Sequence, residues 1–166
     1  MEASSDPVLA LDVDGVISLF GFESPSGEPP GKLIQVDGTP HCIALDTGPR
    51  IRRLGEYYQL IWASGWEERA NDHLPFVLDI NKLPYLSFGG SARWGTAHWK
   101  LEQLESFAAG RPLAWVDDSL DQSCFAWARQ RTDPTLLVPT ESPIGLVDTH
   151  VDTLIRWVRD GYTHSR

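Results

Sequence analysis

The sequence predicts an α/β fold: a doubly wound, Rossmann-like parallel sheet of about five strands with helices on both faces. Three apolar segments of strand length, at 8–13, 58–63 and 112–116, show little polar alternation. Such segments are typical of parallel strands that are covered on both faces. Segments with a helical spacing of apolar residues lie between them, and this alternation favours parallel strands joined by right-handed crossovers.

The first half of the chain is predicted to hold two of these strands, a hairpin and two helices. The Pro-, Gly- and Ser-rich segment 21–31 follows the first strand and is predicted to be loop. Short apolar segments at 33–36 and 41–45 flank Asp37-Gly38, a pair typical of tight turns, so a small β-hairpin is expected there. The next predicted elements are a helix at 48–57 with Pro49 in its first turn, the strand at 58–63 and a helix at 66–73.

The second half of the chain is predicted to continue the alternation. A further strand is expected within 76–88, and residues 89–95 are predicted to be loop. Thr96 is expected to cap a helix at 96–108, and Asp121 is expected to cap a helix at 121–131 rather than to bind a metal. The last elements are a short strand at 135–138 and an amphipathic helix at 148–159, whose apolar face holds Val151, Leu154, Ile155 and Val158.

Length, charge and composition limit the class of protein. The chain has 166 residues, 42% of them hydrophobic, so we expect one domain spanning 1–166. A net charge of -9 argues against a broad nucleic-acid-binding surface or attachment to an anionic membrane. The absence of a leader pattern and of a membrane-length apolar segment predicts a soluble, cytoplasmic protein. Cys42 and Cys124 are too few for a disulfide framework and are predicted to be small buried thiols in a reducing compartment.

Polar residues follow three of the predicted strands where they end: Asp12 with Asp14, Ser64 with Gly65, and Asp117 with Asp118. Ligands of open parallel sheets bind beyond the carboxyl ends of the strands, so these residues are expected to face one crevice. Residues two apart in an extended chain point to the same side, which would place both Asp12 and Asp14 there. Four carboxylates in one small volume need a compensating cation. Magnesium is the expected cofactor, because it prefers oxygen ligands and also binds substrate phosphates.

Lys100 and Ser64 add groups that are suited to a phosphate. Lys100 lies on the predicted helix between the serine strand and the acidic-pair strand, and it could reach the crevice as a point charge. Ser64 lies at a helix start, where a phosphate binds well. Each feature alone has a simpler explanation: the two acids could form a strand-end turn or a calcium loop, Ser64 could cap a helix, and Lys100 could be a solvated charge. Together they indicate a phosphoryl-transfer site.

The segments LDVDGVI, WASG, TAHWK and LAWVDDS occur in this order along the chain. They resemble the four motifs of the haloacid dehalogenase (HAD) superfamily, here in its aspartate-nucleophile phosphatases. Two longer segments, WASGWEERAN and GRPLAWVDD, are similar to the small HAD domain associated with RNA-repair proteins. The resemblance implies that Asp12 attacks phosphorus, and that Asp14 protonates the leaving oxygen and then activates water. Ser64 and Gly65 would bind the phosphoryl group, and Lys100 would neutralise it together with the nucleophile.

The resemblance also implies a metal site. Asp118 would bind Mg²⁺ directly, with Asp12 and the carbonyl of Asp14 as further ligands. Asp117 would either share this role or hold Lys100 or a metal-bound water. An aspartate at position 14 is the phosphatase pattern of the family, so the expected activity is the magnesium-dependent hydrolysis of a phosphomonoester.

The gaps between these motifs do not fit a full cap domain. The insert at 20–45, with its hairpin, is the expected flap, and water would be excluded by this flap, by a partner subunit or by the substrate. An open site favours bulky substrates such as a nucleotide, a nucleic-acid end or a phosphorylated protein. The oligomeric state is left open.

Two other functions are considered. One is a receiver-like signalling domain that accepts a phosphoryl group, although a receiver has its metal-binding acids on the first strand and its lysine on the last, whereas here the acidic pair follows the lysine. The other is a catalytically silent binding module with the HAD fold, which the complete motif set disfavours.

Several further residues have open roles. Trp66, Trp94 and Trp99 could stack on a substrate ring, although core packing is favoured. Glu67 and Asn71 could contact substrate or lie on a solvated helix face. A basic cluster of Arg50, Arg52 and Arg53 could contact a phosphate backbone, which is the less favoured interpretation. The five histidines show no ligand spacing and are assigned no role.

Overall fold

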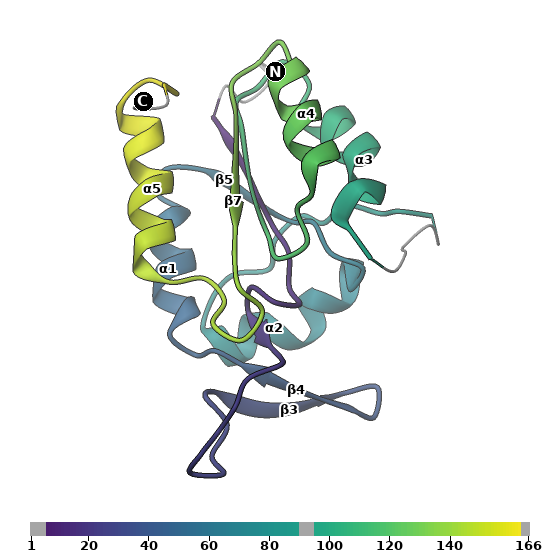
Figure 1. Ribbon diagram of the computed structural model, residues 1–166, viewed down its shortest axis with the longest axis vertical. Helices are drawn as coiled ribbons and strands as arrows, with labels where there is room; N and C mark the ends of the chain where they lie inside the picture. Colours follow the sequence, from purple (N-terminus) through teal and green to yellow (C-terminus); the bar gives the residue numbers. More distant parts are fainter. Residues whose placement is uncertain (1–5, 90–94, 164–166) are drawn as a thin grey trace.

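A four-stranded parallel sheet forms the centre of the molecule, and a three-stranded antiparallel sheet lies beyond one end of it (Figure 1). The computed structural model describes residues 6–89 and 95–163. The parallel sheet has the order β5 (Gln59–Trp62), β1 (Val8–Leu11), β6 (Leu113–Asp117) and β7 (Thr135–Pro139). The α/β fold with a parallel sheet and no large cap is thereby confirmed.

Both faces of the parallel sheet are covered by helices, which explains why its strands lack polar alternation. Leu9 and Leu11 of β1 belong to one core, while Val8 and Ala10 belong to the other. The first core is completed by α1 (Thr47–Leu54), α2 (Ala70–Leu78) and α5 (Asp148–Arg159). The second is completed by α3 (Leu101–Phe107) and α4 (Gln122–Gln130). Figure 1 shows α1 and α5 on one side of the sheet, and α3 and α4 on the other.

The predicted helix caps are confirmed. The side chain of Thr96 accepts a hydrogen bond from the His98 N–H at the start of the 3₁₀ helix η2 (Ala97–Lys100), which leads directly into α3. Asp121 accepts from the Cys124 N–H at a distance of 3.1 Å and caps α4. A capping carboxylate satisfies a backbone donor that has no partner within the helix. The cap at Thr96 matters for the site, because it fixes where the helix that carries Lys100 begins.

The predicted hairpin is confirmed as β3 (Lys32–Val36) and β4 (Thr39–Ile43). Asp37 and Gly38 form its turn with φ of 50° and 80°, the left-handed conformations that two-residue hairpin turns require. A strand that the sequence does not reveal, β2 (Ser18–Leu19), pairs with β4 and ties the hairpin to the segment that follows β1. The hairpin therefore stands next to the carboxyl end of the central strand.

The prediction of a strand within 76–88 is wrong, and the parallel sheet has four strands rather than about five. The helix α2 continues to Leu78, because Ala70, Leu74 and Leu78 lie one turn apart and all reach the core. The following segment runs beside β5 but pairs with it only through a single bridge between Tyr85 and Trp62. Pro84 has no N–H to donate to a strand ladder.

Glu67 and Asn71 hold this segment against β5. The Asn71 amide accepts from the Leu83 N–H at 3.0 Å and donates to the Leu83 carbonyl at 2.8 Å. The Glu67 carboxylate accepts from the Phe88 N–H at 2.8 Å. Neither interpretation given from the sequence, substrate contact or a solvated face, describes these two residues. They replace the missing strand pairing with side-chain hydrogen bonds.

Three further predictions concern thiols, loops and membrane segments. Cys42 and Cys124 are both buried and free, as expected. The segment 21–31 contains no helix or strand, as expected, whereas most of the loop predicted at 89–95 lies outside the described residues. Within the described part of the chain, none of the helices combines the length and the apolar character that a membrane span requires.

A substitution at Gly48 tests how closely α1 packs against α2. A Cβ at this buried position would meet the backbone carbonyl of Leu78, which cannot move without displacing α2. We expect Gly48→Ala to lower the free energy of unfolding by about 2 kcal/mol, because overpacking forces the backbone to shift. Chemical denaturation monitored by circular dichroism measures this change.

Gly55→Ala is the matched control on the same helix. Gly55 has φ of -63° at the C-cap of α1, and its Cβ would lie 3.4 Å or more from its neighbours. Its free energy of unfolding should stay the same or rise by up to about 1 kcal/mol. Equal losses in the two variants would contradict the proposed tight contact at Gly48.

Candidate active site

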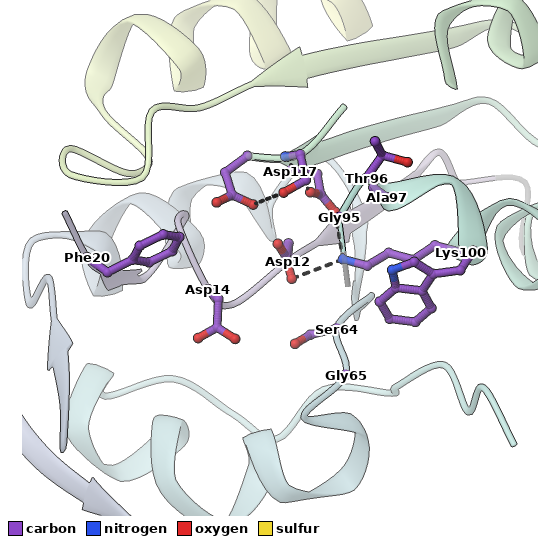
Figure 2. Close-up of a pocket in the computed structure, with 13 residues that line it drawn as sticks. Asp12, Asp14, Phe20, Ser64, Gly65, Gly95, Thr96, Ala97, Lys100 and Asp117 are labelled. Carbon is purple, nitrogen blue, oxygen red and sulfur yellow. Dashed lines mark hydrogen bonds and ion pairs between the residues drawn. The ribbon is translucent and has the colours of Figure 1, made fainter. Parts of the chain in front are cut away.

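The residues that the sequence predicts for the site line one cavity of about 390 Å³ (Figure 2). The cavity lies at the carboxyl ends of β1, β5 and β6, as expected for a parallel sheet. The predicted residues in its lining are Asp12, Asp14, Ser64, Gly65, Lys100, Asp117 and Asp118. The structure also places Phe20, Gly95, Thr96, Ala97, Trp99 and Ser119 around it.

Lys100 forms ion pairs with two acids from neighbouring strands. Its Nζ lies 3.0 Å from Asp12 Oδ1 and 2.6 Å from Asp117 Oδ2 (Figure 2). The three side chains are at least nine-tenths buried. Burial lowers the pKa of Lys100, but Asp12 and Asp117 more than compensate, so its pKa lies above the usual value. The ammonium group is therefore charged at neutral pH and neutralises part of the acidic cluster.

Burial has the opposite effect on Asp12. It raises the pKa of this carboxyl well above its usual value, and Lys100 opposes the rise while Asp117 and Asp118 add to it. The Val13 N–H donates to Asp12 Oδ1 at 2.8 Å and fixes the orientation of the carboxylate. A bound cation would lower the pKa of Asp12, because a nearby positive charge favours the ionised form of an acid. The fixed orientation and the raised pKa of this carboxyl therefore favour binding of a further cation.

Asp12, Asp117 and Asp118 form a group that could hold a metal ion. One ligand oxygen of each lies within 4.8 Å of the others. The Asp118 carboxylate accepts from the hydroxyl of Ser119 at 3.0 Å and of Ser142 at 2.8 Å, which orients it from behind. Lys100 balances one of the three negative charges, so a surplus of acid remains. Clustered carboxylate oxygens with surplus negative charge suit a hard divalent cation.

Asp14 lies apart from this group, so four carboxylates do not converge as the sequence suggested. Its Oδ2 accepts from Trp66 Nε1 at 3.2 Å, and its Oδ1 lies 3.8 Å from His41 Nδ1. Asp12 and Asp14 both line the cavity, as expected, while Val13 between them enters the core. The chain bends at Val13, and the two carboxylates have different partners. Figure 2 shows the Asp14 carboxylate pointing away from Lys100. The ligand role of its backbone carbonyl stays a prediction.

The pKa of Asp14 is raised, although its side chain is half exposed (52%). Partial burial raises the pKa of this carboxyl, and the hydrogen bond from Trp66 and the proximity of His41 oppose the rise. An acid whose pKa is raised in this way can donate a proton closer to neutral pH. Asp12 and Asp14 thus have different environments although only one residue separates them.

Gly15 makes this arrangement possible. Its φ of 78° lies in the left-handed region, and a Cβ at this position would meet the side chain of Asp118. Its carbonyl accepts a hydrogen bond of 2.8 Å from the hydroxyl of Thr140, which follows β7. The loop after β1 can therefore lie directly against Asp118.

Ser64 is buried at the end of β5 and faces the cavity. Its Oγ accepts a hydrogen bond of 3.1 Å from the Trp66 N–H, so the serine also supports the turn into the 3₁₀ helix η1 (Glu67–Arg69). The capping role and the cavity-facing role are therefore compatible. The hydroxyl group can still donate its own hydrogen to a ligand oxygen.

The tryptophans divide between core and cavity. Trp62, Trp115 and Trp157 are buried. Of the three tryptophans considered for stacking on a substrate, Trp66 and Trp99 are partly buried and pack against the two cores. Trp99 lines the cavity and packs edge-on against Phe88, with ring centroids 4.6 Å apart. Trp66 contacts Asp14 from the flap side. Trp94 lies outside the described residues.

The basic cluster on α1 forms contacts within the protein. Arg50 pairs with Asp148 at 2.8 Å, and Arg53 lies 3.8 Å from Asp152, both on α5. Arg52 donates to the carbonyl of Asp79 at 2.7 Å, just after α2. These arginines are absent from the described lining of the cavity, and their contacts favour a structural role.

Sequence reasoning missed several residues that shape the site. His41 on β4 reaches Asp14 across the flap, and Phe20 lines the cavity. Ser119 and Ser142 hold Asp118. A hairpin placed directly after the acidic loop is the signal that could have drawn attention to His41. Ser119 directly follows the acidic pair, so its position next to Asp118 could also have indicated it, whereas the loop after β7 brings in Ser142 from 24 residues away.

Comparison with known proteins supports the fold. No family model matches the chain, and no curated protein matches it. One similar solved structure is the HAD domain of effector protein Lem4 from Legionella pneumophila, with a TM-score of 0.54 and 12% sequence identity. The match covers 96% of this chain and 98% of that domain. An identity this low shows the fold alone, and the chain has a HAD-like fold.

The raised pKa of Asp12 predicts how stability depends on pH in metal-free protein. A carboxyl whose pKa is raised on folding binds more protons in the native state, so stability falls as pH rises from the unfolded-state pKa through the folded-state pKa. We expect Asp12→Asn to reduce this fall and to make the metal-free protein more stable than the wild type at pH 7. Urea denaturation in EDTA between pH 4 and pH 8 measures both effects.

Asp148→Asn is a control in which the pKa of the replaced carboxyl is lowered on folding rather than raised. A hydrogen bond from Arg50 lowers the pKa of Asp148, so its contribution to stability is present above the unfolded-state pKa and is lost as pH falls. This variant should be no more stable than the wild type at pH 7. A loss of stability in Asp12→Asn at pH 7 would show instead that the ion pair with Lys100 outweighs the burial of the charge.

Proposed function

We propose that this chain is a magnesium-dependent phosphatase of the HAD type that hydrolyses a phosphomonoester through an aspartyl-phosphate on Asp12. The observation that carries the proposal is the division of the acids between two environments. Asp12 lies with Asp117, Asp118 and a charged lysine, whereas Asp14 lies apart against Trp66 and His41. Hydrolysis through a covalent intermediate needs both a nucleophile and a separate proton donor.

The donor set fits magnesium. Mg²⁺ is usually held by one or two carboxylates with waters and substrate phosphate oxygens. Asp12, Asp118 and the carbonyl of Asp14 would hold it, while Asp117 is engaged by Lys100 and by the Ser119 N–H at 2.9 Å. When bound, the ion would neutralise the phosphate and lower the pKa of Asp12.

In the first step, an Oδ of Asp12 attacks phosphorus and the bond from phosphorus to the leaving oxygen breaks. Asp14, protonated, gives its proton to that oxygen, and the alcohol departs. Ser64 donates a hydrogen bond to a phosphoryl oxygen, and the Lys100 ammonium balances charge on Asp12 and the phosphoryl group. The ion pair with Asp117 keeps Lys100 in position throughout.

In the second step, Asp14 acts as a base. Now ionised, it takes a proton from a water molecule, whose oxygen attacks phosphorus. The bond from phosphorus to Asp12 breaks, which releases inorganic phosphate and restores both acids to their starting forms. The sum of the two steps is ester plus water to alcohol plus phosphate. The position of Asp14 on the flap side leaves it beside both the departing alcohol and the incoming water.

Turnover of an aryl phosphate tests the proposal. We expect release of inorganic phosphate with Mg²⁺, its loss in EDTA, and a decrease in kcat of about 10³-fold or more in Asp12→Asn, because the nucleophile is removed. Asp148→Asn, a charge-neutralising change on α5, should retain wild-type turnover. Phosphate release that persists in Asp12→Asn would contradict a nucleophilic role for Asp12, and stoichiometric phosphorylation without release would indicate a receiver-like domain.

Asp14→Asn separates the two steps. An aryl phosphate has a good leaving group that needs little protonation, so the first step should continue while the second lacks its base. We expect a burst of aryl alcohol approaching one equivalent, followed by turnover about 100-fold slower than in the wild type. Rapid-mix kinetics and intact-mass detection of a phosphorylated protein measure this result. Equal slowing of both steps, with no phosphorylated protein, would argue against Asp14 as the base.

A further inference from the structure

A second cavity, of about 350 Å³, adjoins the first on the flap side of Asp14. We call it the flap cavity. Its lining includes Asp37, Thr39 and His41 from the hairpin, and Gly65, Trp66 and Arg69 from the turn after β5 and from η1. Gly65 lines both cavities. The flap cavity is therefore next to the phosphoryl site and is built from a different pair of elements.

Asp14 connects the two cavities. Trp66 and His41 each line the flap cavity, and each also contacts the Asp14 carboxylate. The leaving oxygen of a substrate must lie beside Asp14 if this acid is to protonate it. The rest of the leaving group then has space available in the flap cavity, directly beyond these two rings.

The lining of the flap cavity suits a planar polar ring. The rings of Trp66 and His41 meet edge to face with centroids 4.8 Å apart, and both side chains are only partly buried. Thr39 and the Arg69–Asp37 ion pair add donors and acceptors around them. Aromatic side chains bind nucleobases by stacking, and polar groups at the edge bind base nitrogens and oxygens.

Charge distinguishes a nucleoside from other leaving groups. Arg69 already forms an ion pair with Asp37, so the flap cavity offers no unbalanced positive charge for a second phosphate. A short aliphatic alcohol would use neither ring. A phenol side chain would use the rings but has few polar atoms for Thr39, Asp37 and Arg69. Cavities of this volume lie within the usual range for small-molecule sites.

We propose that the flap cavity is a leaving-group subsite that takes the nucleoside part of a nucleotide, with its base against Trp66 and His41. This inference rests on the proposed phosphatase activity and names its substrate class. Trp66 then has two separate functions: its indole N–H positions Asp14, and its ring binds the base. The base makes no covalent change, so it contributes binding and orientation only.

The test compares two phosphates that differ only in the base. Nucleoside 5′-monophosphates and ribose 5-phosphate are both cleaved at a primary ribose 5′-oxygen, so their ratio of kcat/KM reports the contribution of the base. We expect the wild type to favour the nucleotides, and Trp66→Leu to reduce this ratio about 10-fold, as expected for the loss of one base stack. An unchanged ratio in Trp66→Leu would overturn the proposal.

Two further variants control for the contact with Asp14 and for the location of the base. Trp66→Phe removes the indole N–H but retains a ring, so it should lower kcat for both substrates while largely preserving their ratio. Phe20→Ala removes a half-exposed ring that lines the first cavity but is absent from the described lining of the flap cavity, and it should leave the ratio unchanged. Loss of base preference in Phe20→Ala, with its retention in Trp66→Leu, would place the base elsewhere and overturn the subsite.

Other substrates identify the source of the nucleotide. Oligonucleotides with a terminal 5′ or 3′ phosphate, nucleoside 3′-monophosphates and a phosphotyrosine peptide are compared under the same conditions. Preference for oligonucleotides over free nucleotides, or the reverse, supports the subsite and identifies which form it serves. A phosphotyrosine peptide that is preferred over every nucleotide, in a manner that depends on Trp66, would overturn the assignment to a nucleoside.

Binding measurements distinguish failure of the subsite from failure of the proposed activity. If the wild type hydrolyses none of these phosphates with Mg²⁺, the proposed phosphatase activity fails. Calorimetric titration of the wild type with a nucleoside 5′-monophosphate and with ribose 5-phosphate then decides the subsite. Tighter binding of the nucleotide that is lost in Trp66→Leu supports it, and equal binding of the two compounds overturns it.

Discussion

The buried ion pairs of Lys100 with Asp12 and Asp117 are the constraint on which the rest of the site depends. They connect the end of the central strand β1, the end of β6 and the helix that precedes α3. A buried lysine is unfavourable unless acids accompany it, and buried acids repel one another unless a cation accompanies them. Lys100 therefore offsets the repulsion between the two acids, and the surplus of negative charge near Asp118 remains for a further cation.

Close packing against Asp118 determines the course of the loop after β1. Gly15 allows the backbone to approach Asp118, and the loop then carries Asp14 away from the acidic cluster to Trp66 and His41. Two acids separated by one residue thereby acquire different surroundings, one with a lysine and two acids, the other with an indole and an imidazole. In the proposed reaction this separation divides the covalent chemistry from the proton transfers. The hairpin is part of the division, because it supplies His41 and closes the side on which a leaving group would lie.

The strands and helices that sequence reasoning located well are those with strong local signals. The apolar segments became β1, β5 and β6, and the spacing of Val151, Leu154 and Ile155 gave the observed bounds of α5. Asp37-Gly38 formed the expected turn because its backbone conformation is favoured in those residue types. The prediction of a strand within 76–88 was wrong because it relied on local signals alone, namely prolines and short apolar runs. The segment instead contains the end of a helix that reaches Leu78 and an extended part held by Asn71 and Glu67.

The sequence by itself determined which chemical groups stand at the ends of the strands, because apolar runs and turn residues act over a few positions. It thereby indicated the fold and most of the polar residues that line the cavity at the ends of the strands. Tertiary structure decided how those groups are partnered: Asp117 with Lys100, Asp118 with Ser119 and Ser142, and Asp14 with Trp66 and His41. Most of these partners come from distant parts of the chain, and their distances follow from how the helices, the flap and the loops pack, which no local pattern records.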